Sequence, residues 1–114
     1  MVQTATPRYE TLKVGEEGPK WEIGPVTLAM ILRYAGASGD FNPLHNDPDY
    51  AKAAGYPGIF AMGMMTAGYL GRYVSEWMGP QNIRRFKVRF LDQVWPGDVL
   101  TCGGRVTEKR PRHS

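Results

Sequence analysis

The chain has 114 residues, of which 42% are hydrophobic and 22% are charged, and its formal net charge is +3. This length is typical of one folded domain, and this balance excludes an intrinsically disordered chain. A single cysteine excludes an internal disulfide and is typical of a reducing compartment. We therefore predict one domain over residues 1–114, with a loose arm over residues 1–18 and a polar tail over residues 108–114.

The sequence shows no membrane or export segment. The longest apolar stretch, residues 61–78, contains Arg72 and Glu76 and is interrupted by glycines, so it is a poor membrane span. The first nine residues lack the apolar core of a signal peptide. These features predict a cytoplasmic location.

The first elements are a short strand and a helix. Trp21 and Ile23 predict the strand, which ends at Gly24-Pro25. Thr27 is a predicted N-cap for a helix over residues 27–35. Its apolar residues recur at helical spacing: Leu28, Ile31, Leu32 and Ala35.

The next segment, residues 39–48, carries an acid and an imidazole five residues apart, Asp40 and His45. Pro43 and Pro48 exclude a helix through this segment, because proline removes a backbone donor and restricts the residue before it. A carboxylate and an imidazole on one structured loop can hold a water, take its proton and return a proton to the substrate. The Asn42 amide is suited to fix this loop or orient the acid. The alternative is that Asp40 and Asn42 only make turn hydrogen bonds and that His45 is a surface residue.

Two more helices are predicted after this loop. Asp47 is expected to cap a short helix over residues 48–54, since Pro48 suits the first helical position. A longer helix is predicted over residues 62–78, and its apolar residues lie on most of its sides, so it is expected to be buried. These residues are Met64, Met65, Ala67, Tyr69, Leu70, Tyr73, Val74 and Trp77. The unpaired N–H groups at the start of this helix are suited to stabilise a developing oxyanion.

The last third of the chain predicts two strands. Residues 85–91 alternate between apolar and basic side chains, and residues 99–107 form a second candidate strand in which Cys102 is a core residue. The basic residues here are Arg84, Arg85, Lys87 and Arg89. They are suited to attract a phosphorylated ligand, or they form only a solvated face. Because the aromatic residues alternate on one face, they indicate a strand with a core side instead of a platform for stacking nucleic-acid bases.

Residues 39–48, Gly-Asp-Phe-Asn-Pro-Leu-His-Asn-Asp-Pro, resemble the signature of the MaoC-like hydratases, also called R-specific enoyl-CoA hydratases. The resemblance extends over about residues 14–107. It implies an α+β hot-dog fold, in which a curved antiparallel sheet wraps a long central helix. It also implies that Asp40 and His45 activate water for reversible addition to a trans-2-enoyl thioester, while the Gly63 N–H holds the thioester oxygen. The family usually has histidine before this glycine, whereas this chain has Met62.

The resemblance implies an enoyl-thioester hydratase, equally a (3R)-hydroxyacyl-thioester dehydratase. The expected substrate-binding residues are Asn42, Met62, Met64, Arg84 and Arg85. We expect no metal and no cofactor, apart from coenzyme A or an acyl carrier as part of the substrate, since the histidines and the cysteine show no ligand spacing. Two alternatives are a non-catalytic acyl-binding or partner subunit of a hydratase assembly and a hot-dog acyl thioesterase.

The resembled family continues with two more strands after the position of residue 114. Three predicted strands are too few to wrap a helix about 10 Å across, so a monomer would expose apolar side chains of the long helix. We therefore expect a homodimer, or a hetero-assembly with a longer hot-dog homologue.

Overall fold

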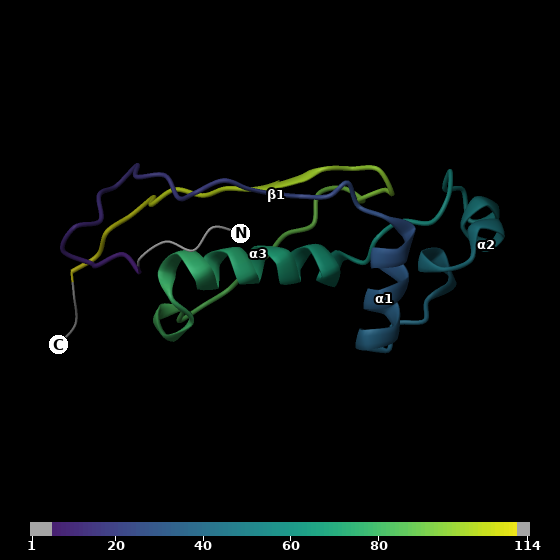
Figure 1. Cartoon of the computed structure of the whole chain (residues 1–114), viewed down its shortest axis with the longest axis horizontal. Helices are drawn as coiled ribbons and strands as arrows, with labels where there is room; N and C mark the ends of the chain where they lie inside the picture. The colour runs from purple at the N-terminus through teal and green to yellow at the C-terminus, as the bar shows by residue number, and fades with distance from the viewer. Residues whose placement is uncertain (1–5, 112–114) are drawn as a thin grey trace.

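The longest helix, α3 (Gly63–Met78), lies along the middle of the molecule in the computed structural model, which describes residues 6–111. Two extended parts of the chain, one before α1 and one near the C-terminus, run beside each other along α3, while α1 and α2 lie at one end (Figure 1). The radius of gyration is 17.2 Å, whereas a compact chain of this length has about 13 Å. The described chain is therefore elongated and wraps α3 incompletely.

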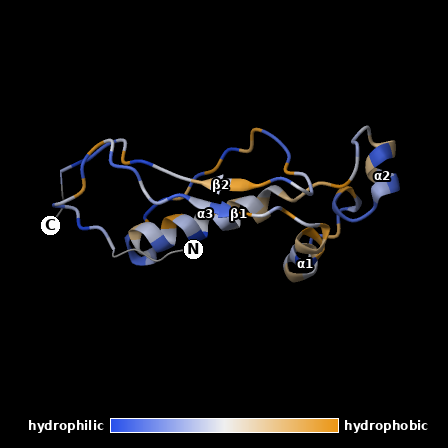
Figure 2. Ribbon diagram, turned by 45° about the horizontal axis from the view of Figure 1, so that its top comes forward, coloured by the Kyte–Doolittle hydropathy of each residue, from blue (hydrophilic) through white to orange (hydrophobic). Residues whose placement is uncertain are grey.

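The sheet consists of two short antiparallel strands, β1 (Trp21–Ile23) and β2 (Leu100–Cys102). Trp21 pairs with Cys102 and Ile23 pairs with Leu100, and Figure 2 shows β2 as an apolar strand. Beyond this ladder, an isolated bridge joins Glu17 to Arg105. The strand predicted over residues 99–107 is thus confirmed only over residues 100–102, near its start, with an isolated bridge at Arg105.

The arm before β1 forms backbone hydrogen bonds to the C-terminal part of the chain from residue 15 onward. The Gly15 N–H donates to the Val106 carbonyl at 2.6 Å, and the Gly18 N–H donates to the Gly104 carbonyl at 2.9 Å. These bonds extend the β1–β2 ribbon past the sheet ladder. Part of the predicted arm (residues 1–5) and His113 in the predicted tail lie outside the described residues.

The strand predicted over residues 85–91 is wrong, because this segment belongs to no sheet in the described part of the chain. Within residues 6–111, no backbone group of this segment forms a hydrogen bond with another backbone group. Its alternating side chains match the pattern of a strand, but a sheet forms only where the backbone also pairs with a neighbouring strand. The described sheet therefore has two strands instead of the three expected.

The first helix, α1 (Leu28–Ser38), begins and ends with capping interactions. The Thr27 hydroxyl accepts a hydrogen bond from the Met30 N–H at 3.1 Å, which confirms the predicted N-cap. Gly39 ends the helix in a left-handed conformation at φ 72°, which glycine adopts without strain. Ile31 is buried, but Leu28 is 47% exposed, so only part of the predicted apolar face is covered.

The main hydrophobic cluster lies between α1 and the start of α3 and consists of Val26, Ile31, Ala35, Ala61, Met62 and Met65. A second packed region lies where the extended ribbon crosses α3. Tyr73 and Trp77 are only 1% and 8% exposed, so these two apolar side chains of the long helix do not face water. The Tyr73 hydroxyl donates to the Pro19 carbonyl at 2.5 Å. Burial, and then the charge of Cys102, raise the pKa of Tyr73, so its hydroxyl keeps the donated proton. Three other apolar residues of α3 are half-buried: Tyr69, Leu70 and Val74.

Gly18 is needed for the close contact between the ribbon and α3. A Cβ atom at Gly18 would lie 2.5 Å from the Tyr73 hydroxyl oxygen and 2.8 Å from Trp77. We expect Gly18→Ala to lower the free energy of unfolding by about 1–3 kcal/mol, because the core would be overpacked. Urea unfolding will measure this change. Gly36→Ala in α1 is the matched control: nothing lies within 4 Å of its Cβ position, and it should stabilise by about 0.5–1 kcal/mol. Equal stability of the two variants would contradict the described contact.

The remaining elements are η1 (Pro43–His45), α2 (Pro48–Ala53) and η2 (Pro80–Asn82). The predicted helices over residues 48–54 and 62–78 are confirmed within one residue at their ends. Among residues 6–111, the structure contains no helix long and apolar enough to cross a membrane.

Candidate active site

The loop after α1 is stabilised by its own short polar side chains. The Asp40 N–H donates to the Ala35 carbonyl at 3.1 Å, which fixes the start of the loop on the helix end. The Asp40 Oδ1 atom accepts from the Asn42 N–H at 3.2 Å, and the Asn42 Oδ1 atom accepts from the Leu44 N–H at 3.1 Å. Asn42 therefore fixes the turn that leads into η1, and it also ties that turn to the Asp40 carboxylate.

His45 is a buried residue of this loop and is only 9% exposed, so it is not the surface histidine of the alternative interpretation. Its Nδ1 atom lies 2.6 Å from the Phe60 carbonyl oxygen, and its ring meets the Phe60 ring edge to face at 5.0 Å. A carbonyl oxygen only accepts hydrogen bonds, so Nδ1 carries the proton. In the neutral ring, Nε2 is then left as a proton acceptor.

The helix α2 supports the loop from the other side. The Asp47 carboxylate accepts hydrogen bonds from the N–H groups of Asp49 and Tyr50 at 3.1 and 3.2 Å. This confirms Asp47 as a helix cap. Asp47 is therefore a structural carboxylate, seven residues after Asp40 in the same loop region.

Phe60 joins the loop to the start of α3, and the sequence analysis did not single it out. Besides its contacts with His45, its ring packs against Tyr56 at 4.8 Å and Trp95 at 5.4 Å between centroids. The next residue, Ala61, donates its N–H to the Val94 carbonyl at 2.8 Å. The only signal in the sequence was an aromatic residue between a Pro-Gly turn and a helix start.

Met62 and Gly63 form the start of α3. Met62 is the buried N-cap residue and makes no side-chain cap hydrogen bond, so the N–H groups of the first turn have no partner from that side chain. Gly63 occupies the first helical position, where a helix carries the positive end of its dipole. The Phe90 ring lies against Gly63: a Cβ atom there would be 3.1 Å from the Phe90 Cζ atom.

A cavity of about 300 Å³ lies beside this helix start. Its lining residues are Phe60, Ala61, Met62, Gly63, Thr66, Phe90, Leu91, Asp92, Gln93 and Val94. Met62 and Gly63 both line this cavity. Asp40 and His45 are not among the lining residues, and His45 connects to the cavity through its contacts with Phe60.

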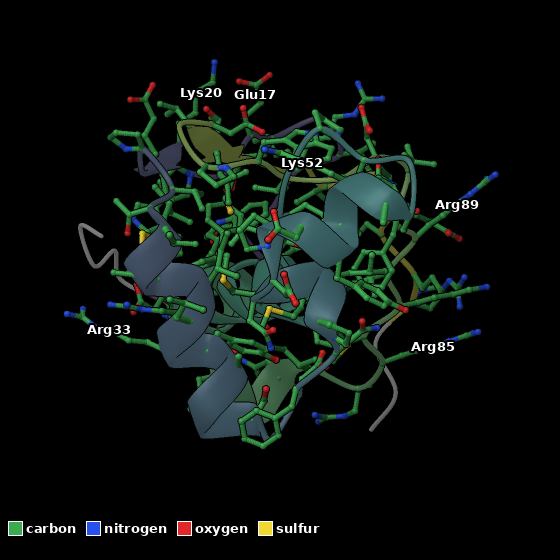
Figure 3. The ribbon with its side chains drawn as sticks, turned by 90° about the vertical axis from the view of Figure 1, so that its right-hand side faces the viewer. Glu17, Lys20, Arg33, Lys52, Arg85 and Arg89 are labelled. Atoms are coloured by element: carbon green, nitrogen blue, oxygen red, sulfur yellow. The ribbon has the colours of Figure 1, made fainter. Side chains whose placement is uncertain are left out.

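Three predicted substrate-binding residues lie away from this cavity. Met64 is 62% exposed and does not line it. Arg84 lines a separate hollow with Arg8 and Asn82, and its Nη1 atom donates to the Gln81 carbonyl at 2.6 Å. The Arg85 side chain points outward from the molecule (Figure 3).

Within residues 6–111, no group of three or more His, Cys, Asp or Glu side chains could hold a metal ion. Burial raises the pKa of the Cys102 thiol. A raised pKa disfavours the thiolate, so Cys102 is poorly suited to act as a nucleophile.

The sequence matches a known family over most of its length. Residues 14–113 match the family described as MaoC like domain. The chain belongs to this family. This MaoC-like chain is 38% identical over 97 residues to peroxisomal enoyl-CoA hydratase 2 of Arabidopsis thaliana, covering 82% of this chain and 29% of the relative. It is 41% identical over 69 residues to 3-hydroxyacyl-thioester dehydratase X of Mycobacterium tuberculosis, covering 60% of this chain and 24% of the relative. The chain therefore spans less than a third of the length of these curated relatives.

Solved structures show the same fold. A MaoC-like dehydratase aligns with a TM-score of 0.83 and 33% identity over 90% of this chain and 33% of that chain. The ChsH1–ChsH2 complex of M. tuberculosis aligns with a TM-score of 0.77 and 30% identity over 87% of this chain and 78% of that chain. The predicted α+β hot-dog class is confirmed, here with a central helix and a small two-stranded sheet.

Proposed function

We propose that this MaoC-like chain provides the catalytic groups of an enoyl-thioester hydratase, which equally dehydrates (3R)-hydroxyacyl thioesters. The substrate is a trans-2-enoyl chain on coenzyme A or an acyl carrier, and no other cofactor takes part. The names of the relatives support the reaction class, because they include an enoyl-CoA hydratase and a 3-hydroxyacyl-thioester dehydratase.

The observation that carries the proposal is the hydrogen bond between His45 Nδ1 and the Phe60 carbonyl. It fixes the tautomer and orientation of a buried imidazole, so Nε2 is available as a base. Asp40 lies on the same loop, where its carboxylate is held by the Asn42 N–H. An oriented base and a carboxylate on one fixed loop suit general acid–base catalysis of water addition.

The proposed roles follow the chemistry of hydration. Asp40 and His45 bind a water, whose oxygen attacks the β-carbon of the enoyl group while its proton passes to this pair. The pair returns a proton to the α-carbon, so a C–O and a C–H bond replace the double bond. The Gly63 N–H, at the positive end of α3, stabilises the negative charge on the thioester oxygen. Met62 and Met64 are proposed to contact the acyl portion.

A second candidate is a partner subunit in a hydratase hetero-assembly. One observation favours it: Asp40 and His45 do not line the cavity beside Gly63. A second chain that reshapes this end of the molecule would then complete the site. The predicted cytoplasmic location stays a prediction, since the Arabidopsis relative is named as peroxisomal.

The loss of enoyl absorbance tests the proposal. Crotonyl, octenoyl and bulky enoyl thioesters are supplied to the purified chain, alone and mixed with a full-length hot-dog hydratase whose own acid and histidine are inactivated. Turnover by the chain alone or with the inactivated hydratase supports the proposed function. Turnover only with the inactivated hydratase supports the partner role as well. No turnover of any substrate in either assay would contradict the hydratase proposal. Release of free thiol would indicate a thioesterase.

Arg84 and Arg85 are proposed to attract the phosphates of the carrier. Arginine forks suit phosphate oxygens, and both side chains are exposed. We expect Arg84→Glu and Arg85→Glu to raise KM, more strongly at low salt, because exposed charges are screened as ionic strength rises. Steady-state kinetics at two salt concentrations will measure this. Arg33→Glu, on another side of the molecule (Figure 3), is the control; the same KM in all three variants would leave these residues as a solvated face.

A further inference from the structure

The Phe60 carbonyl, which accepts a hydrogen bond from His45 Nδ1 at 2.6 Å, belongs to a peptide unit that is also fixed from its other side. The N–H of the same peptide unit, on Ala61, donates to the Val94 carbonyl at 2.8 Å. The imidazole, this peptide unit and Val94 therefore form one continuous chain of hydrogen bonds. Each bond in such a chain polarises the next, so the contact with Val94 makes the Phe60 carbonyl a stronger acceptor.

The Phe60 side chain is contacted by three aromatic rings. The His45 ring meets it edge to face with the centroids 5.0 Å apart, while Tyr56 and Trp95 pack against it at 4.8 and 5.4 Å. Tyr56 is a close neighbour in the sequence, whereas Trp95 comes from the segment after α3 and directly follows Val94. Trp95 therefore holds the Phe60 ring at the place where Val94 holds its peptide unit.

Trp95 lies in a tight turn, residues 95–98, which is bonded to the segment just before α1. Within the turn, the Asp98 N–H donates to the Trp95 carbonyl at 3.1 Å, and the Asp98 Oδ2 atom accepts from the Trp95 N–H at 2.9 Å. The Gly97 N–H donates to the carbonyl of Val26, a residue only 1% exposed, at 2.7 Å. In return, the Val26 N–H donates to the Asp98 carbonyl at 2.8 Å. The Trp95 backbone is thus anchored, and its ring is a fixed support.

The place of Trp95 relative to the cavity separates support from substrate contact. Phe60 and Val94 line the cavity beside the start of α3, but Trp95 is not among the lining residues. A substitution at Trp95 therefore changes no side chain that lines this cavity. Its effect on the imidazole has to pass through the Phe60 ring or the Phe60 peptide unit.

We propose that Trp95 is the positioning residue of the His45 imidazole. Its ring keeps Phe60 in place, so that the Phe60 carbonyl holds the proton on Nδ1 and Nε2 stays free as the base. This inference rests on the proposed role of His45 in hydration. Catalytic groups have to be held within about 0.5 Å and 10–20° of their productive geometry, and a misplacement of about 1 Å can lower a rate about 10²-fold.

Trp95→Leu tests the proposal, and Trp21→Leu is the matched control. Both tryptophans are half-buried and make an edge-type contact with another aromatic ring, but Trp21 packs against Tyr69 on α3 instead of Phe60. We expect Trp95→Leu to lower kcat at least about tenfold and to change KM less than about threefold, because the base is displaced while the cavity lining is kept. Trp21→Leu should leave kcat within about twofold of the wild type. Trp95→Phe keeps an aromatic ring and should restore most of the lost kcat.

Nitrogen NMR of the imidazole measures the positioning directly and requires no turnover. In a His113→Gln background, His45 is the one histidine left in the chain. While the ring is neutral and Nδ1 alone carries the proton, the two ring nitrogens give well-separated signals. We expect Trp95→Leu to move these signals toward each other, because a displaced Phe60 carbonyl lets the proton occupy either nitrogen. Trp21→Leu should leave both signals in place.

A second variant keeps the test decisive if circular dichroism shows that Trp95→Leu does not fold. Asp98→Ala removes an exposed side chain and frees the Trp95 N–H, so the signals should move in the same direction. Signals that stay at their wild-type positions in the folded variant, or that move equally in Trp21→Leu, would overturn the proposal. A chain without any turnover whose His45 signals still respond to Trp95→Leu would contradict the hydratase function and support the positioning role.

Discussion

Asp40→Asn and His45→Gln will each lower the kcat of hydration by at least about 10²-fold while the fold stays intact. Asparagine at position 40 keeps an oxygen that can accept from the Asn42 N–H. Glutamine at position 45 is a polar side chain of similar length that cannot take up a proton. The expected loss therefore reports proton transfer rather than a collapsed loop. Enoyl absorbance gives kcat, and circular dichroism with urea unfolding checks the fold.

Asp47→Asn is the matched control for this pair. Asp47 belongs to the same loop region, but its carboxylate caps α2 through the N–H groups of Asp49 and Tyr50. Asparagine is an equally good cap, so stability should change little. We expect kcat within about twofold of the wild type, because no proton transfer is lost. If the Asp40 or His45 variant behaved like this control, the acid–base assignment would be wrong.

The parts of the fold that the sequence predicted well are those decided by neighbouring residues. Thr27 and Asp47 cap their helices through residues two or three positions away, and such bonds depend only on local chemistry. The two prolines likewise identified residues 39–48 as a structured loop. The positions of Asp40 and Asn42 within that loop also follow from short-range hydrogen bonds.

The parts that sequence reasoning missed depend on contacts between distant residues. The Tyr73 hydroxyl reaches the Pro19 carbonyl, and the Gly18 N–H reaches the Gly104 carbonyl. No local pattern indicates such pairs, so the arm before β1 was expected to be loose. Similarly, residues 85–91 have the alternating pattern of a strand but pair with no strand in the described part of the chain. The position of Phe60 between His45 and the cavity appears only in three dimensions.

Gly63→Pro will lower kcat by about 10²–10³-fold relative to Gly63→Ala, if the Gly63 N–H holds the thioester oxygen. Proline removes this one donor and is well tolerated at the first position of a helix, where the N–H has no helical partner. The preceding residue already has the extended backbone that proline requires, since Met62 lies at φ −68° and ψ 141°. The substitution therefore removes the donor while α3 is expected to remain folded.

Alanine at the same position separates steric effects from the loss of the donor. Both variants bring a Cβ atom to about the position that lies 3.1 Å from Phe90, but only alanine keeps the N–H. Adding Phe90→Leu to each variant removes the aromatic ring from this contact, so the remaining difference in kcat belongs to the hydrogen bond. Gly68→Ala, with nothing within 4 Å of its Cβ position, shows the effect of an added methyl group elsewhere on α3. Equal turnover of the proline and alanine variants would mean that another group stabilises the charge on the thioester oxygen. Gly63 would then serve to leave space for the Phe90 ring instead of acting as an oxyanion donor.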